Sequence, residues 1–141
     1  MTMRSHAKSF QPDSIQRNKP AILCIEDNES HLHLRRAVLE KNGYSVLVAT
    51  TASHALHAIR EFPVSLVITD HMLRGTTGTE LAKEIRRITP HVPILIYSGT
   101  VPEHLGEADC FMSKTESVET LMAMIRDLVN RYWGLIGPFA A

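Results

Sequence analysis

The chain has 141 residues, the usual length of one globular domain and long enough for a hydrophobic core of its own. Lysine and arginine together number 15, as do aspartate and glutamate, so overall charge does not predict a surface for nucleic acids or membranes. No run approaches the roughly 20 apolar residues of a membrane-spanning helix, and the polar N-terminus lacks the apolar core of a secretion signal. We therefore expect a cytoplasmic protein that binds neither nucleic acid nor membrane directly.

The first 19 residues are polar and are expected to form a flexible arm that ends at Pro20. Five short apolar runs then follow, at 21–25 (AILCI), 44–49 (YSVLVA), 64–68 (VSLVI), 92–97 (VPILIY) and 108–112 (ADCFM). The first, third and fourth are almost continuous in leucine, isoleucine and valine. Such runs are typical of parallel strands that are covered on both faces.

Amphipathic segments alternate with these runs and predict helices over 52–59, 81–88 and 118–128, with another after Asn28. Asn28 and Thr115 stand where helix N-caps are expected. Alternating strands and helices with right-handed crossovers predict a doubly wound α/β domain with five parallel strands. Residues 134–141 are expected to form an apolar C-terminal tail.

Polar residues end four of the five predicted strands. Glu26 and Asp27 follow the first, Asp70 the third, Ser98 ends the fourth, and Lys114 comes just after the fifth. In open α/β sheets the functional site lies outside the carboxyl ends of the strands, so these side chains should converge. Three carboxylates held together need a compensating cation, and Mg²⁺, which prefers oxygen ligands, is the natural one.

A carboxylate beside Mg²⁺ and a lysine is a suitable nucleophile toward a phosphoryl group. Asp70 would be this nucleophile, while Lys114 would neutralise charge on the phosphoryl oxygens and Ser98 would donate a hydrogen bond to one of them. An aspartate that merely caps the next helix would account for any one of the acids. Capping alone would not explain why polar residues occur at all of these strand ends.

Several short motifs in this order resemble one known family. The matching residues are Glu26–Asp27, Asp70, Gly78, Ser98, Phe111 and Lys114. Over residues 20–133 the chain resembles the receiver domain of response regulators in two-component signalling. The resemblance implies a flavodoxin-like fold, with a five-stranded parallel sheet in the order 2-1-3-4-5.

The resemblance also implies a role for each motif residue. Asp70 would accept a phosphoryl group from the phosphohistidine of a histidine kinase or phosphotransfer protein. Ser98 and Lys114 would bind that group, and Phe111 would be the aromatic switch residue. The implied Mg²⁺ ligands are three carboxylates and one backbone carbonyl, those of Glu26, Asp27, Asp70 and Met72.

The protein implied by these roles is a single-domain response regulator that signals to a downstream protein that the sequence does not identify. It would not be an enzyme in the usual sense, but a phosphoacceptor that takes part in phosphotransfer and in its own dephosphorylation.

The sequence departs from the family pattern at several positions. Arg74 stands where proline is frequent, Gly99 follows Ser98, and Thr115 replaces the proline that usually follows the lysine, so no cis peptide is expected there. The largest departure is the short crossover after Ser98. Residues 99–113 must include the fifth strand, so the fourth helix should be a single turn at 102–105 or absent. We expect the usual output face to be altered, with signalling through another face or through the 99–107 loop.

Two other families with a strand-ending aspartate fit less well. A haloacid-dehalogenase-type phosphatase has a second acid two residues after its nucleophile, where this chain has Met72. A cobalamin-binding domain has an Asp-x-His-x-x-Gly signature, and here the histidine, His71, comes one place early. One alternative stays open because of the short crossover: a receiver that has lost phosphorylation and serves as an interaction module.

Overall fold

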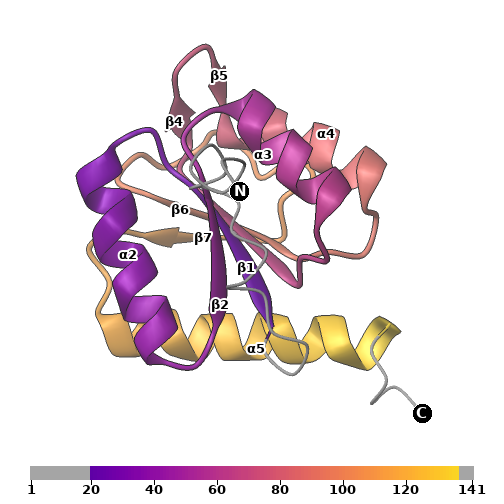
Figure 1. The fold of residues 1–141 in the computed structure, drawn as a ribbon. Helices are drawn as coiled ribbons and strands as arrows, with labels where there is room; N and C mark the ends of the chain where they lie inside the picture. Colours follow the sequence, from indigo (N-terminus) through magenta and orange to yellow (C-terminus); the bar gives the residue numbers. More distant parts are fainter. Residues whose placement is uncertain (1–19, 137–141) are drawn as a thin grey trace, which may run out of the picture.

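A computed structural model gives the structure of the chain and describes residues 20–136. The predicted N-terminal arm, 1–19, and residues 137–141 of the predicted tail lie outside the described residues. The elements along the chain are β1 (Ala21–Ile25), α2 (Glu29–Lys41), β2 (Ser45–Ala49), α3 (Ala52–Glu61), β3 (Leu66–Thr69), β4 (Met72–Leu73), β5 (Thr76–Thr77), α4 (Gly78–Ile88), β6 (Ile94–Ser98), β7 (Cys110–Ser113) and α5 (Val118–Ile136) (Figure 1).

Five strands form one parallel sheet in the order β2-β1-β3-β6-β7. In sequence order these are the second, first, third, fourth and fifth long strands, so the predicted order 2-1-3-4-5 is confirmed. Ile25, the last residue of β1, is in register with Ala49 of β2 and Thr69 of β3. The carboxyl ends of these three strands therefore meet at one edge of the sheet, as the flavodoxin-like fold requires.

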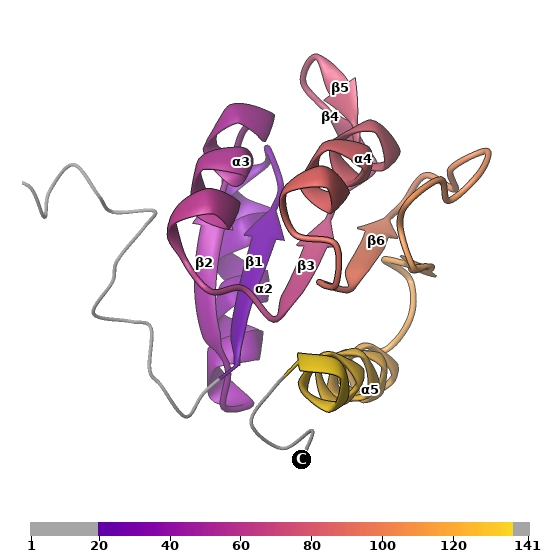
Figure 2. The ribbon, with the colours of Figure 1, turned by 90° about the vertical axis from the view of Figure 1, so that its right-hand side faces the viewer.

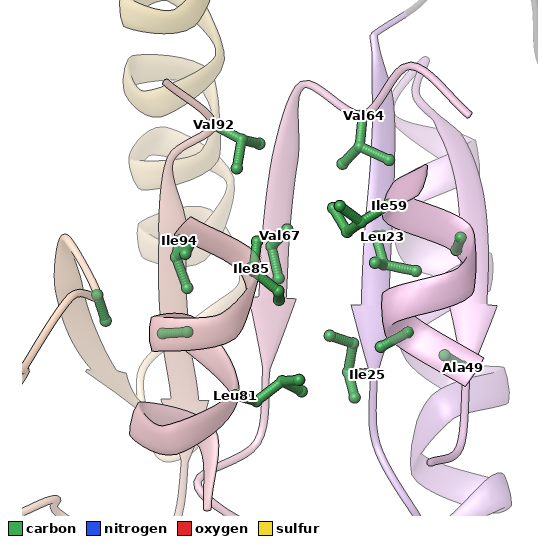
Figure 3. Packing of buried hydrophobic residues seen from close by; sticks show 14 of the residues in the cluster. Leu23, Ile25, Ala49, Ile59, Val64, Val67, Leu81, Ile85, Val92 and Ile94 are labelled. Carbon is green, nitrogen blue, oxygen red and sulfur yellow. The ribbon is translucent and has the colours of Figure 1, made fainter. Parts of the chain in front are cut away.

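Helices cover both faces of the sheet (Figure 1). Helices α3 and α4 pack on one face, and α2 and α5 pack on the other. Side chains of β1 alternate between the two layers, and Leu23 and Ile25 point toward α3 and α4 (Figure 3). Ile22 and Cys24 belong to the core beneath α2 and α5. A strand buried on both faces has no polar position, which explains the continuous apolar run at 21–25.

Hydroxyl and amide side chains cap the starts of the helices. Asn28, Thr51 and Thr77 cap α2, α3 and α4, each accepting a hydrogen bond from a backbone N–H in the first turn. Such a cap stabilises a helix by about 1 kcal/mol. Thr115 does not cap α5, contrary to the sequence prediction. The helix starts later, at Val118, and the Ser117 hydroxyl accepts from the N–H of Thr120 at 3.1 Å.

The crossover from β6 to β7 contains no helix (Figure 2). Of the two sequence alternatives, a single turn or none, the structure has the second. Residues 99–109 instead form an irregular segment whose end is fixed to β6, because the N–H of Asp109 donates to the Ile94 carbonyl at 2.9 Å. The Asp109 carboxylate accepts from the Ile94 N–H at 2.7 Å. Half-buried Leu105 and buried Ala108 pack against the core that α3 and α4 cover.

A small hairpin, β4–β5, lies between β3 and α4 and was not predicted from the sequence. Its two strands pair Met72 with Thr77 and Leu73 with Thr76. Gly75 lies in the turn with a φ of +78°, a conformation that glycine adopts without steric cost. The hairpin places Arg74 at the exposed tip. None of the described helices has the length and apolar character needed to cross a membrane.

Candidate functional site

The acidic residues of the site directly follow the neighbouring strands β1 and β3. The N–H of Glu26 still donates to the Ala49 carbonyl of β2 at 3.1 Å, and the N–H of Asp70 donates to the Ile25 carbonyl at 3.0 Å. This pairing continues the sheet just past the strand ends and aligns the two acidic segments. Carboxylate oxygens of Glu26, Asp27 and Asp70 lie within 4.8 Å of one another. The sheet therefore assembles the cluster that the sequence predicts.

Glu26 is the buried member of this cluster, with its side chain 2% exposed. Its Oε1 accepts from Lys114 Nζ at 2.7 Å and from Arg35 Nη1 at 3.4 Å. Its Oε2 accepts from the backbone N–H of Asn28 at 3.2 Å. A buried carboxylate is stable only when charged or hydrogen-bonding partners replace its water. The two cations and the backbone N–H serve as these partners for Glu26.

Asp70 is the more accessible acid, with its side chain 13% exposed. Burial by itself raises the pKa of the Asp70 carboxyl. A hydrogen bond from Ser98 and the nearby Lys114 ammonium, at 3.3 Å from Oδ2, more than offset this effect on the pKa. The backbone N–H of His71 donates to Oδ1 at 2.8 Å and acts in the same direction. The pKa of Asp70 therefore lies below its ordinary value of 3.8, and the carboxylate is ionised at neutral pH.

Ser98 and Lys114 reach the site from the neighbouring strands β6 and β7. Ser98 is buried at the end of β6, and its Oγ also accepts from the N–H of Thr100 at 3.1 Å. The backbone N–H of Lys114 donates to the Ser98 carbonyl at 3.0 Å, which sets the lysine beside the serine. The Lys114 side chain then bridges Glu26 and Asp70. The arrangement provides one ionised carboxylate flanked by a hydroxyl and an ammonium.

Two further predicted residues make no side-chain hydrogen bond or ion pair with the carboxylates among the described residues. Phe111 is half-buried in β7 and packs against the core beneath α3 and α4. Met72 lies in β4 with its residue surface 54% exposed, two positions after Asp70. The switch role of Phe111 and the metal-ligand role of the Met72 carbonyl stay predictions.

Gly78 has a steric role beside the site. A Cβ at this position would lie 2.5 Å from the carbonyl oxygen of Asp70 and 3.1 Å from the Cα of His71. The N–H of Gly78 donates to the His71 carbonyl. Only glycine therefore allows the first residue of α4 to approach the backbone of the Asp70 segment this closely.

Arg35 is a site residue that the sequence reasoning missed. It is 8% exposed, and its guanidinium pairs with Glu26 at 3.4 Å. Leu32, Arg35 and Leu39 are the buried residues of α2, so the arginine lies on the inner face of this helix. An arginine at helical spacing with buried leucines was the available signal, since a buried arginine needs an anionic partner.

The donor set fits a hard divalent cation. Three carboxylates outnumber the two cations, Lys114 and Arg35, so the cluster keeps a net negative charge. Mg²⁺ takes oxygen ligands and is usually bound by a few carboxylates together with water. The chemistry of these oxygens fits Mg²⁺.

Comparison with known proteins identifies the family. Residues 22–126 match the response regulator receiver domain family, and this match covers most of the chain. The chain therefore belongs to this family of two-component signalling proteins, as its motifs and sheet order indicate. The matched region lies inside the predicted domain of residues 20–133.

Two curated relatives are transcriptional regulatory proteins. The uncharacterized regulatory protein YkoG of Bacillus subtilis (strain 168) is 30% identical over 114 residues, and ZraR of Salmonella typhimurium is 36% identical over 83 residues. The aligned regions cover 77% and 59% of this chain, but 50% and 19% of the relatives. The chain thus spans at most half the length of these two relatives.

Solved receiver domains share the fold. A CheY-like receiver domain protein from Methanospirillum hungatei JF-1 has a TM-score of 0.77 and 23% identity, covering 82% of this chain and 97% of that one. The response regulator TrrA from Thermotoga maritima, solved in complex with Mg(2+)-BeF, has a TM-score of 0.73 and 25% identity. That match covers 77% of this chain and 98% of TrrA.

Proposed function

We propose that this receiver domain accepts a phosphoryl group on Asp70 from a phosphohistidine. The observation that carries the proposal is the position of the Asp70 carboxylate, 3.3 Å from Lys114 Nζ and beside the Ser98 hydroxyl, which lowers the pKa of Asp70. A phosphoryl group attached to Asp70 would meet an ammonium and a hydroxyl that are already in place. Positioning and charge stabilisation of this kind supply most of the catalysis in phosphoryl transfer.

The proposed transfer is a displacement at phosphorus. An oxygen of the Asp70 carboxylate forms a bond to phosphorus while the P–N bond to the donor imidazole breaks, and its electron pair returns to the ring nitrogen. Because the pKa of Asp70 is lowered, the carboxylate is already ionised and needs no general base. Lys114 would pair with the phosphoryl oxygens, and Phe111 would report the change to the surface.

Mg²⁺ is the proposed cofactor of this reaction. The carboxylates of Glu26, Asp27 and Asp70 would hold it, together with the backbone carbonyl of Met72. When bound, the ion neutralises negative charge on the transferring group. The relative TrrA, solved in complex with Mg(2+)-BeF, supports this assignment.

The proposed protein is a phosphoacceptor rather than an enzyme with a separate substrate. Its partners would be a histidine kinase or phosphotransfer protein and a downstream protein, all in the cytoplasm. The relatives are named transcriptional regulatory proteins. For the domain itself we propose no direct contact with nucleic acid, since the chain carries no net charge.

One observation favours a second candidate function, a phosphorylation-independent interaction module. The missing helix between β6 and β7 removes part of the usual output face, so phosphorylation would need another route to a partner. The set of reacting groups around Asp70 favours the phosphoacceptor.

Intact mass measurement distinguishes the two functions. We expect the wild-type protein to gain the mass of one phosphoryl group when incubated with acetyl phosphate and Mg²⁺, and the Asp70→Asn variant to gain none. Asp127→Asn is the matched control, because Asp127 is exposed on α5 and pairs only with Arg131 at 3.8 Å in the described structure. An unmodified wild type would favour the interaction module, and equal labelling of Asp70→Asn would place the acceptor elsewhere.

A further inference from the structure

The acidic cluster contains a cation that the proposed phosphotransfer does not use. Arg35 lies on the inner face of α2, with its side chain 7% exposed, and its Nη1 is 3.4 Å from Glu26 Oε1. Lys114 Nζ donates to the same oxygen at 2.7 Å. Two protein cations therefore share one oxygen of a carboxylate that is also a candidate metal ligand.

The Arg35 guanidinium also contacts an aromatic ring. Its Cζ lies 4.8 Å from the centroid of Tyr97, within the range of a cation–π interaction. Tyr97 is half-buried on β6, directly before Ser98. The guanidinium thus contacts both the carboxylate cluster and a side chain outside it.

Tyr97 and Arg35 also line a cleft between α2 and α5, with a volume of about 230 Å³. Lys114 lines the same cleft, so all three residues connect it with the site. Its remaining walls are largely apolar, and they include Leu34 of α2 and Val118 of α5, which are 69% and 51% exposed. A change in the position of Arg35 would therefore alter both the cluster and the wall of this cleft.

The charges predict competition between Arg35 and a divalent cation. With Arg35 and Lys114 present, the three carboxylates keep about one net negative charge, whereas without Arg35 they would keep about two. A dication that binds Glu26 must also displace or share the hydrogen bonds that Arg35 and Lys114 make. Both effects lower the affinity of the cluster for the dication.

We propose that Arg35 is an internal competitor of Mg²⁺ for Glu26 and links occupancy of the site to the α2–α5 cleft. With Glu26 bound to Mg²⁺, the Arg35 guanidinium would lose its ion pair with Glu26 and keep its contact with the Tyr97 ring. The ring environment of Tyr97 then reports metal binding at the edge of the cleft. The inference rests on the Mg²⁺ site of the proposed function but not on phosphorylation.

Calorimetric titration with MgCl₂, without any phosphoryl donor, tests the competition. Arg35→Met removes the charge and keeps much of the apolar length, and we expect it to bind Mg²⁺ about tenfold more tightly than the wild type. Arg36→Gln is the matched control, since Arg36 is the next residue of α2 and pairs with Glu40 at 3.1 Å. We expect Arg36→Gln to bind Mg²⁺ with the same affinity as the wild type. An Arg35→Met affinity equal to or weaker than the wild-type affinity would overturn the proposal.

Aromatic NMR spectra test the link to the cleft. We expect the Tyr97 ring signals, assigned with Tyr97→Phe, to shift when Mg²⁺ is added to the wild type and to stay fixed in Arg35→Met at saturating Mg²⁺. Arg35→Lys is the alternative variant if Arg35→Met does not fold. Lysine retains the charge but lacks the planar group that stacks on Tyr97. We therefore expect the Mg²⁺ affinity of Arg35→Lys to stay near the wild-type value, while the shift of the Tyr97 signals is lost. A Tyr97 shift that persists in both variants would refute the link.

The outcomes are separable from those of the phosphorylation test. Protein that shows the Arg35 effects but gains no phosphoryl mass would leave this inference standing and remove the phosphoacceptor role. If the protein is phosphorylated and Arg35→Met binds Mg²⁺ like the wild type, the phosphoacceptor role stands and this inference falls. Absence of Mg²⁺ binding in both wild type and Arg35→Met would overturn this inference together with the metal assignment.

Discussion

At the residue scale, Gly78 sets how closely α4 approaches the segment that carries Asp70. Its missing side chain leaves room for the Asp70 carbonyl oxygen, which would lie 2.5 Å from a Cβ. The obstructing atom belongs to the backbone, so a side chain could be accommodated only if α4 or the Asp70 segment moved. Such movement would displace the proposed phosphoacceptor.

We expect Gly78→Ala to lower the free energy of unfolding by about 1–3 kcal/mol, the usual cost of overpacking a buried contact. It should also slow phosphorylation of Asp70 by acetyl phosphate. Gly99→Ala is the matched control, because a Cβ at Gly99 would have no atom within 4 Å and the residue is exposed. Urea unfolding and a time course of intact mass check both expectations, and equal stability of the two variants would contradict the steric role.

The residues of the site differ in how far sequence could predict them. Asp70 and Ser98 were predictable because each ends an apolar run, and parallel strands bring their ends to one edge. Arg35 was missed although it has helical spacing with buried leucines, because its pairing with Glu26, nine residues earlier, depends on the tertiary packing of α2 against β1. The choice of Ser117 over Thr115 as the cap of α5 was also missed, since both residues can act as caps.

At the element scale, Arg86 of α4 fixes the helix-free crossover. Its Nη2 donates to the Glu107 carbonyl and to the Asp109 carboxylate, both at 2.9 Å. Its Nη1 donates to the carbonyls of Pro90 and Val92, before β6. One side chain thus joins the last turn of α4 to the loop before β6 and to the C-terminal end of the segment that replaces a helix.

We expect Arg86→Ala to lower the free energy of unfolding by about 1–3 kcal/mol, because the carbonyls of Pro90, Val92 and Glu107 would lose this donor. Arg87→Ala is the matched control, since Arg87 is the next residue of α4 and is exposed. Its effect should stay within about 0.5 kcal/mol, as for most surface substitutions. Thermal unfolding measures both, and equal effects would show that the Arg86 hydrogen bonds do not stabilise the crossover.

Sequence predicted most of the elements because their signals are local. The apolar runs located all five strands of the sheet, and the short distance from Ser98 to Lys114 predicted a lost or shortened helix. The β4–β5 hairpin escaped prediction because two-residue strands carry no periodic pattern. The Arg86 hydrogen bonds escaped it because an arginine on the last turn of a helix usually faces water.

At the scale of the whole molecule, the two layers on the sheet are unequal. Helices α2 and α5 cover one face, whereas α3 and α4 share the other with the irregular segment 99–109 (Figure 2). This segment follows Ser98 directly, and the N–H of Thr100 donates to the Ser98 hydroxyl at 3.1 Å. A Ser98 hydroxyl that turned toward a phosphoryl group would release this hydrogen bond. The segment is therefore directly connected to the site through Ser98.

We expect Mg²⁺ with beryllofluoride, a phosphoryl analogue, to change amide hydrogen exchange of the wild type within residues 99–109. The physical reason is the coupling of Thr100 to Ser98, since a lost hydrogen bond alters local opening. Asp70→Asn is the control, because it lacks the carboxylate that the analogue needs. Unchanged exchange over 99–109, with changes confined to α5, would place the output elsewhere.

The two ends of helix α4 contact different parts of the molecule. Its first residue, Gly78, abuts the backbone of Asp70, and Arg86 in its last turn bonds to Glu107 and Asp109 beside the edge strand β7. Eleven residues of helix make a rod of about 16 Å between these contacts. A small displacement of the Asp70 backbone would therefore reach the margin of the sheet as a rigid-body movement of this rod, and the chain would need no helix between β6 and β7 to transmit it.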